Sequence, residues 1–296
     1  MTKVLLFTLL FGVSGFAWAL APAADGFPSN QIFRGNDLAP VQIGQALEGL
    51  RPGAVLILGE HHGTAEQALQ QSYLIESISK TGILTSVGME FFEYPQQAVV
   101  DQYRSGVLAE SDFLAAIQWG KGFPFSAYRK QVGLPQWGRE FVVALNAPRA
   151  LTGKIAKSGI ASLTAAEQAL LPPDFTRGNA NYFDRFLETM GGHVAPEKVE
   201  NYFLAQSTWD DTMAWQASRF LAEHPEQILV IIVGEFHIQY GGGLPDRLRA
   251  RGVSDIRTFS MLNLEGLSES EQVSELSPSP RWGPRADYIW TSRIKP

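Results

Sequence analysis

The sequence predicts an α/β protein with a mostly parallel central sheet flanked by helices, and with a long helical insertion or lid. Short, wholly apolar runs alternate with helical patterns, as in parallel sheets whose strands are buried on both faces. Two of these runs end alike: residues 55–58 lead into Gly-Glu-His-His at 59–62, and residues 229–233 lead into Gly-Glu-Phe-His at 234–237. Each pattern predicts a buried strand that ends at a glycine and is followed by polar side chains.

The other expected elements follow the same alternation, which favours parallel pairing. Strands are expected at 55–58, 85–89, 141–145, 228–233, 255–260 and about 287–290. Helices are expected at 65–80, 95–104, 110–118, from beyond 149 to about 157, and at 244–250. Residues 164–222 have an almost entirely helical pattern, broken at 172–173, 178 and 191–192. We therefore expect a helical insertion or lid over about 158–222, between the third and fourth strands.

The first residues have the pattern of a secretory signal peptide. Lys3 is followed by an apolar stretch over 4–13 and by Ala17-Trp18-Ala19, a small-x-small cleavage pattern. The apolar stretch is shorter than the ~20 residues of a transmembrane helix, so cleavage after Ala19 is favoured over a membrane anchor. We expect a soluble, periplasmic or secreted protein without an integral membrane span after cleavage. Its expected parts are a signal peptide (1–19), an N-terminal linker or arm (20–36) and one domain (37–296).

The composition excludes several classes of function. The sequence has no cysteine, which excludes disulfides, thiolate metal sites, a cysteine nucleophile and a lipidated N-terminal cysteine. The net charge of −6, without a basic run, argues against a nucleic-acid partner. Serine-hydrolase, P-loop, dinucleotide-binding and His-Glu-x-x-His motifs are absent. Charged residues make up 18% of the sequence, below the ~25% of typical domains, and this indicates an apolar surface that something covers.

The doubled Gly-Glu-x-His pattern is the strongest functional signal. Loops that follow the carboxyl ends of parallel strands converge on one crevice, where ligands bind. We therefore expect Glu60 and His62 to share a cavity with Glu235 and His237. Such a cavity would hold a metal, a metal-bearing cofactor or a small polar substrate. The alternative is that Glu60 or His61 caps the following helix or solvates the loop.

Two further places carry candidate site residues. Glu90 directly follows the apolar residues 87–89, so it lies at an expected strand end, and a salt bridge to Arg149 is its alternative role. Gln206, Asp210 and Met213 are spaced to share one face of a helix that could close over a polar crevice. The methionine could equally belong to the core, and the aspartate could pair with a lysine.

The segment after the second Gly-Glu-x-His pattern is rich in glycine. Tyr240 is followed by Gly241, Gly242 and Gly243, and then by an expected helix with Pro245 in its first turn. Free backbone N–H groups at such a helix start favour an anion, such as a carboxylate or a phosphate. A plain glycine-rich turn is the alternative. Tyr240 could serve as an oxygen ligand or a hydrogen-bond donor, or as a buried structural side chain.

Six motifs in order resemble the ChaN-like haem-binding uptake family, within the wider Tiki/TraB and erythromycin-esterase-like superfamily. They are Leu-Gly-Glu-x-His (58–62), Gly-Met-Glu-Phe-Phe (88–92), Asn-Ala-Pro-Arg (146–149), Ala-Gln-x-x-x-Asp-x-x-Met-Ala (205–214), Gly-x-x-His-Ile-x-Tyr-Gly-x-Gly-Leu-Pro (234–245) and Ala-Asp-Tyr-Ile-Trp (286–290). The resemblance covers about residues 38–292. It implies an α/β core with a helical lid and haem bound in a pocket, in the best-known relative as a cofacial pair at a dimer interface with tyrosine ligation.

Under this resemblance the protein would be a periplasmic haem-binding protein of haem or iron uptake, with haem or another small ligand as its partner and a possible homodimer. Tyr240 is the candidate iron ligand because it lies inside a matching motif, and a histidine is the alternative. Haem also needs an apolar slot and a cationic or N–H-rich place for its propionates. The expected cofactor-binding residues are Tyr240, His61, Arg149, Gln206, Asp210, Met213, Gly242 and Gly243.

The alternative function is a metal-dependent hydrolase, esterase-like or protease-like, because relatives in the wider superfamily use the Glu and His of these motifs. Glu60 would act as general base, and Glu90 would orient the site. His62 and His237, with Glu60, would ligate a divalent metal ion or polarise the substrate. Carboxylates and imidazoles suit such a metal in a chain without thiols. A third interpretation treats the site as vestigial, in a protein that only binds its ligand.

Overall fold

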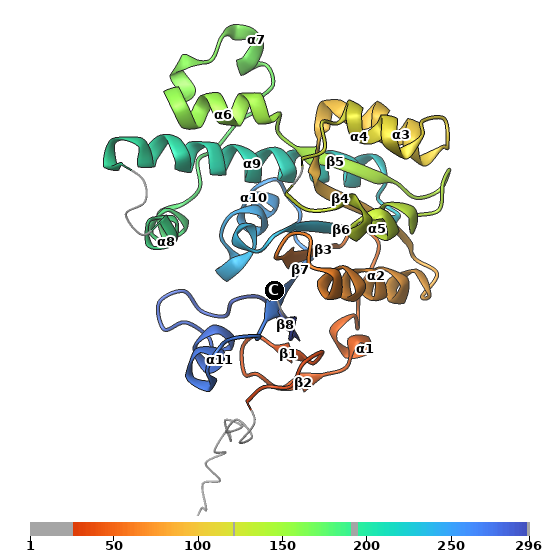
Figure 1. Cartoon of the computed structure of the whole chain (residues 1–296), viewed down its shortest axis with the longest axis vertical. Helices are drawn as coiled ribbons and strands as arrows, with labels where there is room; N and C mark the ends of the chain where they lie inside the picture. Colours follow the sequence, from red (N-terminus) through yellow and green to blue (C-terminus); the bar gives the residue numbers. More distant parts are fainter. Residues whose placement is uncertain (1–25, 121, 191–194, 295–296) are drawn as a thin grey trace, which may run out of the picture.

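The structure, a computed structural model, describes residues 26–120, 122–190 and 195–294. Its centre is an eight-stranded sheet with the order β2-β1-β8-β7-β3-β6-β4-β5 (Figure 1). The six strands from β8 to β5 are parallel, while β1 and β2 pair antiparallel at one edge. The strands are β1 (Ile32–Arg34), β2 (Pro40–Val41), β3 (Val55–Glu60), β4 (Leu84–Glu93), β5 (Val142–Asn146), β6 (Gln227–Gly234), β7 (Ile256–Asn263) and β8 (Tyr288–Ser292). The predicted α/β class with a mostly parallel sheet is confirmed.

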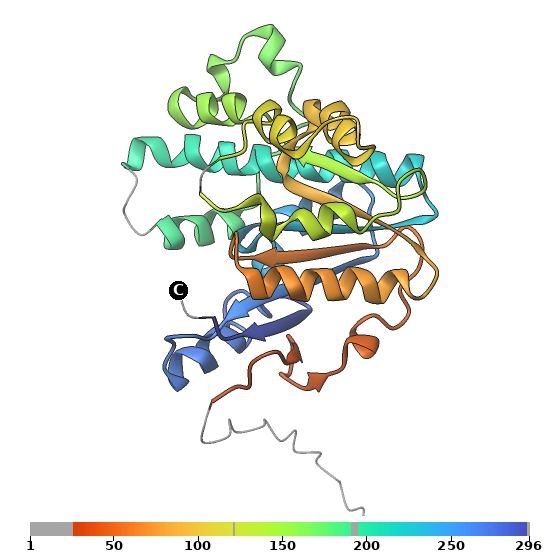
Figure 2. The same ribbon diagram turned by 45° about the vertical axis from the view of Figure 1, so that its right-hand side comes forward.

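Helices cover both faces of the sheet. Successive residues of a strand point to opposite faces, and the residues on both faces are apolar. Leu56 and Leu58 pack against one layer of helices, and Val55 and Ile57 pack against the other. The first layer holds α1 (Ile43–Ala46), α2 (Ala65–Ser79), α3 (Gln97–Arg104), α4 (Glu110–Ala116) and α5 (Arg129–Gly133), and the second holds α9 (Pro196–Glu223) and α10 (Leu244–Ala250). Figure 2 shows α2 lying along β3.

The long helix α9 belongs to the core of the sheet in its second half and to the peripheral helices in its first half. Its second half is part of the core, since Met213, Ala217 and Leu221 pack on β3, β5 and β6. Its first half extends past the sheet and packs with α6 (Arg149–Ser158) and α8 (Ala180–Met190), while α7 (Ala165–Gln168) lies on the far side of α6, as Figure 1 shows. The expected insertion over 158–222 is therefore only partly a peripheral element, because the crossover from β5 to β6 needs a helix on the sheet. Residues 169–179, expected to be largely helical, contain no helix.

Several boundaries differ from the expected ones. Residues 32–34, counted in the N-terminal arm, form β1 and pair with β8. The second parallel strand runs on through a bulge to Glu93, so Glu90 lies inside β4 and not at its end. A helix α11 (Glu269–Leu276), which the sequence analysis missed, packs on the last strands. The expected signal peptide at 1–19 and the break at 191–192 lie outside the described residues.

Within the described ranges, none of the helices combines the length and the apolar character that crossing a bilayer requires.

Candidate functional site

The two Gly-Glu-x-His segments lie side by side at the carboxyl edge of the sheet. β3 and β6 are neighbours, and Glu60 is in register with Gly234. β4 pairs with the other side of β6 and brings Glu90 to the same edge. The predicted meeting of His62 and His237 is confirmed, because both imidazoles contact the carboxylate of Glu90.

Five side chains form a continuous row, which we call the carboxylate–imidazole array: Glu60, His62, Glu90, His237 and Asp210. The first pair joins Glu60 Oε1 to His62 Nδ1 at 3.0 Å. The two oxygens of Glu90 lie 3.9 Å from His62 Nε2 and 3.5 Å from His237 Nε2. The last pair joins His237 Nδ1 to Asp210 Oδ1 at 2.7 Å. Acids and imidazoles thus alternate from the α2 layer, across the end of β6, to the α9 layer.

The Glu60 end of the array is closed to solvent. The Glu60 side chain is fully buried, and it accepts hydrogen bonds from the Tyr128 hydroxyl and from Gln71 Nε2. Burial, and then the neighbouring Glu60 charge, raise the pKa of Tyr128, so this phenol stays a donor. Because its side chain is buried and its oxygens accept these bonds, Glu60 is placed to orient His62.

The Asp210 end is also enclosed. The Tyr182 hydroxyl donates to Asp210 Oδ2 at 2.9 Å, and Gln206 Nε2 donates to the Tyr182 oxygen at 3.1 Å. Gln206 Nε2 also lies 3.1 Å from His237 Nδ1. That nitrogen carries the proton it donates to Asp210, so the contact with Gln206 is not a second hydrogen bond. Gln206 and Asp210 therefore support His237 from within the core.

The protonation of the array follows from its charges. Burial alone lowers the pKa of His237, but the carboxylates of Asp210 and Glu90 outweigh it and raise that pKa to about 10. Burial alone raises the pKa of Glu90, but the charge and hydrogen bond of His237 lower it to about 2. For His62 the pKa is also raised, because Glu60 and Glu90 outweigh partial burial. At neutral pH, His237 is an imidazolium between two carboxylates.

Gly234 explains why the repeated pattern needs its glycine. Its backbone N–H donates to Glu90 Oε2 at 2.6 Å. A Cβ atom at this position would stand 3.1 Å from the His62 ring, closer than side chains normally pack. The glycine thus lets the imidazole of one strand end lie over the backbone of the next.

An aromatic cavity opens beside His62. The rings of Phe91 and Phe123 lie 5.1 and 5.5 Å from the imidazole. Together with Trp119 and Arg149 they line a cavity of about 210 Å3, which we call the aromatic slot. Arg149 stands at its exposed rim, with its Nε 3.9 Å from Glu93 and not paired with Glu90 as the alternative role required.

Glu235 does not join the array, and the expectation that both glutamates of the doubled pattern share one cavity is wrong. Its Oε1 accepts from Ser260 Oγ at 2.6 Å and from Arg285 Nε at 2.9 Å. The short 3-10 turn that follows β6 directs this side chain toward β7, while His237 turns toward α9. The second acid beside the two imidazoles is Glu90 of β4.

Tyr240 lies in a separate hollow on the α8 side. It has a left-handed backbone, with φ of 58°, and its half-buried ring lies 5.1 Å from the Arg185 guanidinium carbon. The hollow measures about 90 Å3, and Trp282 is also part of its wall. Gly242 and Gly243 pass so close to Tyr182 that a Cβ atom on either would lie 3.0 Å from its ring. These glycines serve close packing.

The remaining expected residues are placed as follows. Met213 is fully buried in the core and lines none of the cavities described, because its helix face packs on the sheet. His61 is exposed next to the array. The sequence analysis missed Tyr128, Gln71 and Tyr182, which fix the two ends of the array. Tyr128 belongs to the aromatic segment 119–138, whose lack of a helical or strand period was the only signal.

A comparison with known protein families gives a match to one family. Residues 46–248 match the family described as haem-binding uptake, Tiki superfamily, ChaN. The chain belongs to this family.

The chain is also similar to solved structures. ChaN of Campylobacter jejuni, in a structure described as cofacial haem binding, is 16% identical, with 88% of this chain and 95% of that chain covered and a TM-score of 0.61. The likeness shows a shared fold. The erythromycin esterase EreC (14% identity, 75% and 72% covered, TM-score 0.44) and the type III effector HopBA1 (9% identity, 86% and 92% covered, TM-score 0.46) are more distant. No curated protein sequence gives a match.

A divalent metal fits this ChaN-family array poorly. In the described part of the chain, no group of three or more His, Asp or Glu side chains has the arrangement that holds a metal ion. His62 and His237 are each bound to carboxylates through Nδ1, and Glu60 is occupied by two further donors. Ligation by His62, His237 and Glu60 would require these pairs to open and protons to leave.

Proposed function

We propose that this ChaN-family protein binds haem outside the cytoplasm in haem or iron uptake, with Tyr240 as the axial ligand of the iron. The bound haem would supply a ferric iron, and the Tyr240 hydroxyl would hold it. The observation that carries the proposal is the pairing of a half-buried phenol with a cation: the Arg185 guanidinium carbon lies 5.1 Å from the Tyr240 ring. Tyrosine is one of the side chains that hold haem iron in proteins.

The loop that carries Tyr240 is held firmly. The Tyr240 backbone N–H donates to the Arg285 carbonyl at 2.7 Å. Arg185 Nη1 donates to the Gln239 carbonyl at 2.5 Å. A left-handed non-glycine residue persists only where its surroundings fix it, and such strain clusters at functional sites. The surroundings of Tyr240 thus preorganise its hydroxyl.

The hollow at Tyr240 is too small to enclose haem by itself. About 90 Å3 at Tyr240 is far below the ~300–1,000 Å3 of pockets that enclose a ligand of this size. Haem bound there would lie against an open face, and a second copy of the protein would cover its other face. We therefore include a homodimer in the proposal.

Titration of the purified protein with hemin tests the iron ligand. We expect a Soret band of tyrosinate-ligated haem that is lost or strongly shifted in Tyr240→Phe. Tyr202→Phe is the matched control, because the Tyr202 side chain is 40% exposed on α9 and lines no part of the hollow. An unchanged Soret band in Tyr240→Phe would overturn the assignment of Tyr240, and no hemin binding at all would overturn the function.

One observation favours a second candidate, an esterase-like hydrolase. Glu60 holds His62 through Nδ1, while the His62 side chain remains 35% exposed beside the aromatic slot. His62 Nε2 would then take a proton from water, and Glu60 would orient it, in place of the base role expected for Glu60. The slot would receive an apolar acyl group, with Arg149 at its rim available to a carboxylate.

Hydrolysis of p-nitrophenyl butyrate tests this candidate. Because the pKa of His62 is raised above its ordinary value of 6.5, the fraction in the base form should grow as the pH rises beyond 6.5, and turnover should rise with it. His62→Gln should abolish turnover, and Tyr240→Phe should leave it unchanged. Equal rates with the wild-type protein and His62→Gln would remove this candidate.

A further inference from the structure

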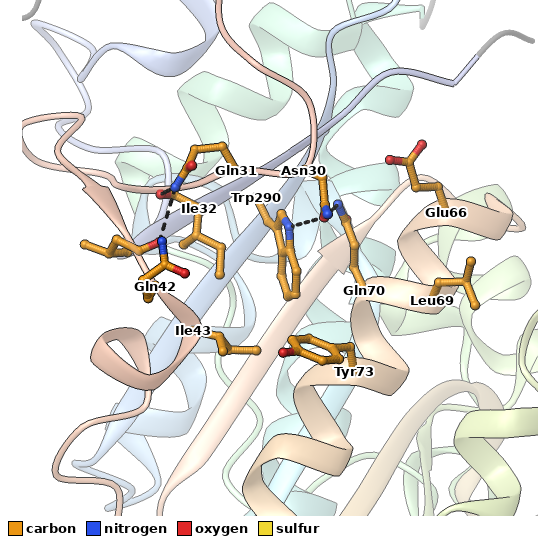
Figure 3. Close-up of a pocket in the computed structure, with 11 residues that line it drawn as sticks. Asn30, Gln31, Ile32, Gln42, Ile43, Glu66, Leu69, Gln70, Tyr73 and Trp290 are labelled. Atoms are coloured by element: carbon orange, nitrogen blue, oxygen red, sulfur yellow. Dashed lines mark hydrogen bonds between the residues drawn. The ribbon is translucent and has the colours of Figure 1, made fainter.

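A third cavity lies at the β2–β1 edge of the sheet, apart from the aromatic slot and the hollow at Tyr240. It measures about 460 Å3 and opens between α2, the β1–β2 edge and β8. This size falls within the range of small-molecule sites. Figure 3 shows its walls: Gln70, Leu69, Tyr73 and Glu66 from α2 on one side, Gln31 and Gln42 on the other, and Trp290 between them.

We propose that this cavity binds a neutral sugar, with Tyr73 as the surface on which the sugar ring stacks. The Tyr73 side chain is 50% exposed, and the neighbouring Leu69 is 64% exposed. The Trp290 ring stands edge-on to Tyr73, with ring centres 6.4 Å apart and planes at 73°. An accessible aromatic face beside polar groups suits the apolar C–H face of a sugar ring, whose hydroxyls point sideways.

The polar wall of the cavity is made of amides, and two of them have free capacity. The Gln70 side chain is 4% exposed, and its Nε2 donates to the Thr291 carbonyl at 3.0 Å. This leaves Oε1 buried, and no described residue donates to it. An unsatisfied buried acceptor is costly. Because Oε1 is closed to solvent, a ligand hydroxyl would remove that cost once the Gln70 amide turned toward the cavity.

Asn30 supplies the complementary donor. Its Oδ1 accepts from Trp290 Nε1 at 3.0 Å and from Gln70 Nε2 at 3.5 Å (Figure 3). Both bonds use the oxygen, and no bond from Nδ2 to a described residue accompanies them, so this exposed amide group is available to donate to a ligand. Asn30 also holds a left-handed backbone, with φ of 56°, which fixes where its amide sits. A free donor and a free acceptor in one cavity match hydroxyl groups, which both donate and accept.

The residues that line the cavity carry no positive charge, which disfavours an anionic ligand. None of the eleven lining residues is a lysine, an arginine or a histidine, and Glu66 is the one charged residue among them. A phosphate or a haem propionate would find no counterion here. The cavity therefore differs in chemistry from the hollow at Tyr240, which Arg185 lines, and the proposal does not depend on haem binding.

Isothermal titration calorimetry on the full-length protein tests the proposal, with maltotriose and tri-N-acetylchitotriose as probes. We expect saturable binding of at least one probe below about 10 mM. Tyr73→Ala should weaken binding by about tenfold or more, whereas Tyr73→Phe, which keeps the ring, should stay within about twofold. Tyr202→Ala, an exposed tyrosine on α9, is the matched control and should change nothing.

A second variant tests the polar wall without removing packing. Asn30→Asp keeps the oxygen that Trp290 needs and tolerates the left-handed backbone, but it replaces the Nδ2 donor with an acceptor. Binding should fall by about fivefold or more. No saturable heat with either sugar, or sugar binding that neither Tyr73→Ala nor Asn30→Asp weakens, would overturn the proposal. Binding of spermidine instead, lost in Glu66→Gln, would show a cation site and overturn it too.

Discussion

The charge state of His237 gives the most direct test of the carboxylate–imidazole array. The pKa of His237 in the folded protein is about 10, compared with an ordinary value of 6.5. That difference corresponds to about 5 kcal/mol of interaction that favours the protonated form. The lowered pKa of Glu90 reports the same pair, so the two are not added. Asp210→Asn removes the charge 2.7 Å from Nδ1, and we expect it to lower the pKa of His237 and destabilise the protein by about 3 kcal/mol at pH 7.

The raised pKa of His237 also determines how the stability of the protein changes with pH. The pKa of His237 is raised on folding, so its stabilisation is fully present below pH 6.5 and is lost as the pH rises toward 10. Over that window the His237 contribution to the free energy of unfolding should fall by about 1.4 kcal/mol per pH unit. The penalty of Asp210→Asn should therefore shrink from pH 7 to pH 10.

Urea unfolding between pH 6 and pH 10 measures these free energies, and imidazole NMR follows the titration itself. Asp184→Asn is the control, because Asp184 forms an exposed pair with Arg281, and it should cost less than about 1 kcal/mol at every pH. If the His237 imidazole titrates near 6.5 in the wild-type protein, or if Asp210→Asn costs the same at pH 6 and pH 10, the description of the array is refuted.

Three other substitutions test the surroundings of the site by thermal or urea unfolding. Gly234→Ala should cost about 1–3 kcal/mol, because its Cβ atom would press on the His62 ring; a neutral effect would contradict that contact. Tyr128→Phe removes a buried donor to Glu60 and should also cost about 1–3 kcal/mol, together with a measurable change in the His62 titration. Arg285→Met leaves the buried carboxylate that follows β6 without its counterion, so a loss of about 3–5 kcal/mol is expected, and a wild-type stability would show that this ion pair is dispensable.

The sequence predicted the sheet and the meeting of the two Gly-Glu-x-His strand ends well, because both depend on local patterns. Runs such as 229–233 are apolar on both faces, which only a doubly covered strand satisfies. The repeated glycine before Glu60 and Glu235 located two neighbouring strand ends. The pairing of β3 with β6 then brought His62 and His237 together, as the strand-end rule implies.

The errors come from directions that local patterns do not encode. A bulge in β4 places Glu90 inside a strand and still turns it toward His237. The turn after β6 sends Glu235 away, toward Arg285. Met213 shares a helix face with Asp210, but that face lies against the sheet, so the methionine is core.

By itself, the sequence determined which elements form and which side chains stand at the carboxyl edge of the sheet, since apolar periodicity and glycine placement act within a few residues. Only the tertiary structure decided the partners. Tyr128 reaches Glu60 and Tyr182 reaches Asp210 across 68 and 28 residues, and these contacts set which oxygens are closed and which imidazole stays exposed. Protonation depends on burial and on charges a few ångströms away, and these distances exist only after the chain has packed.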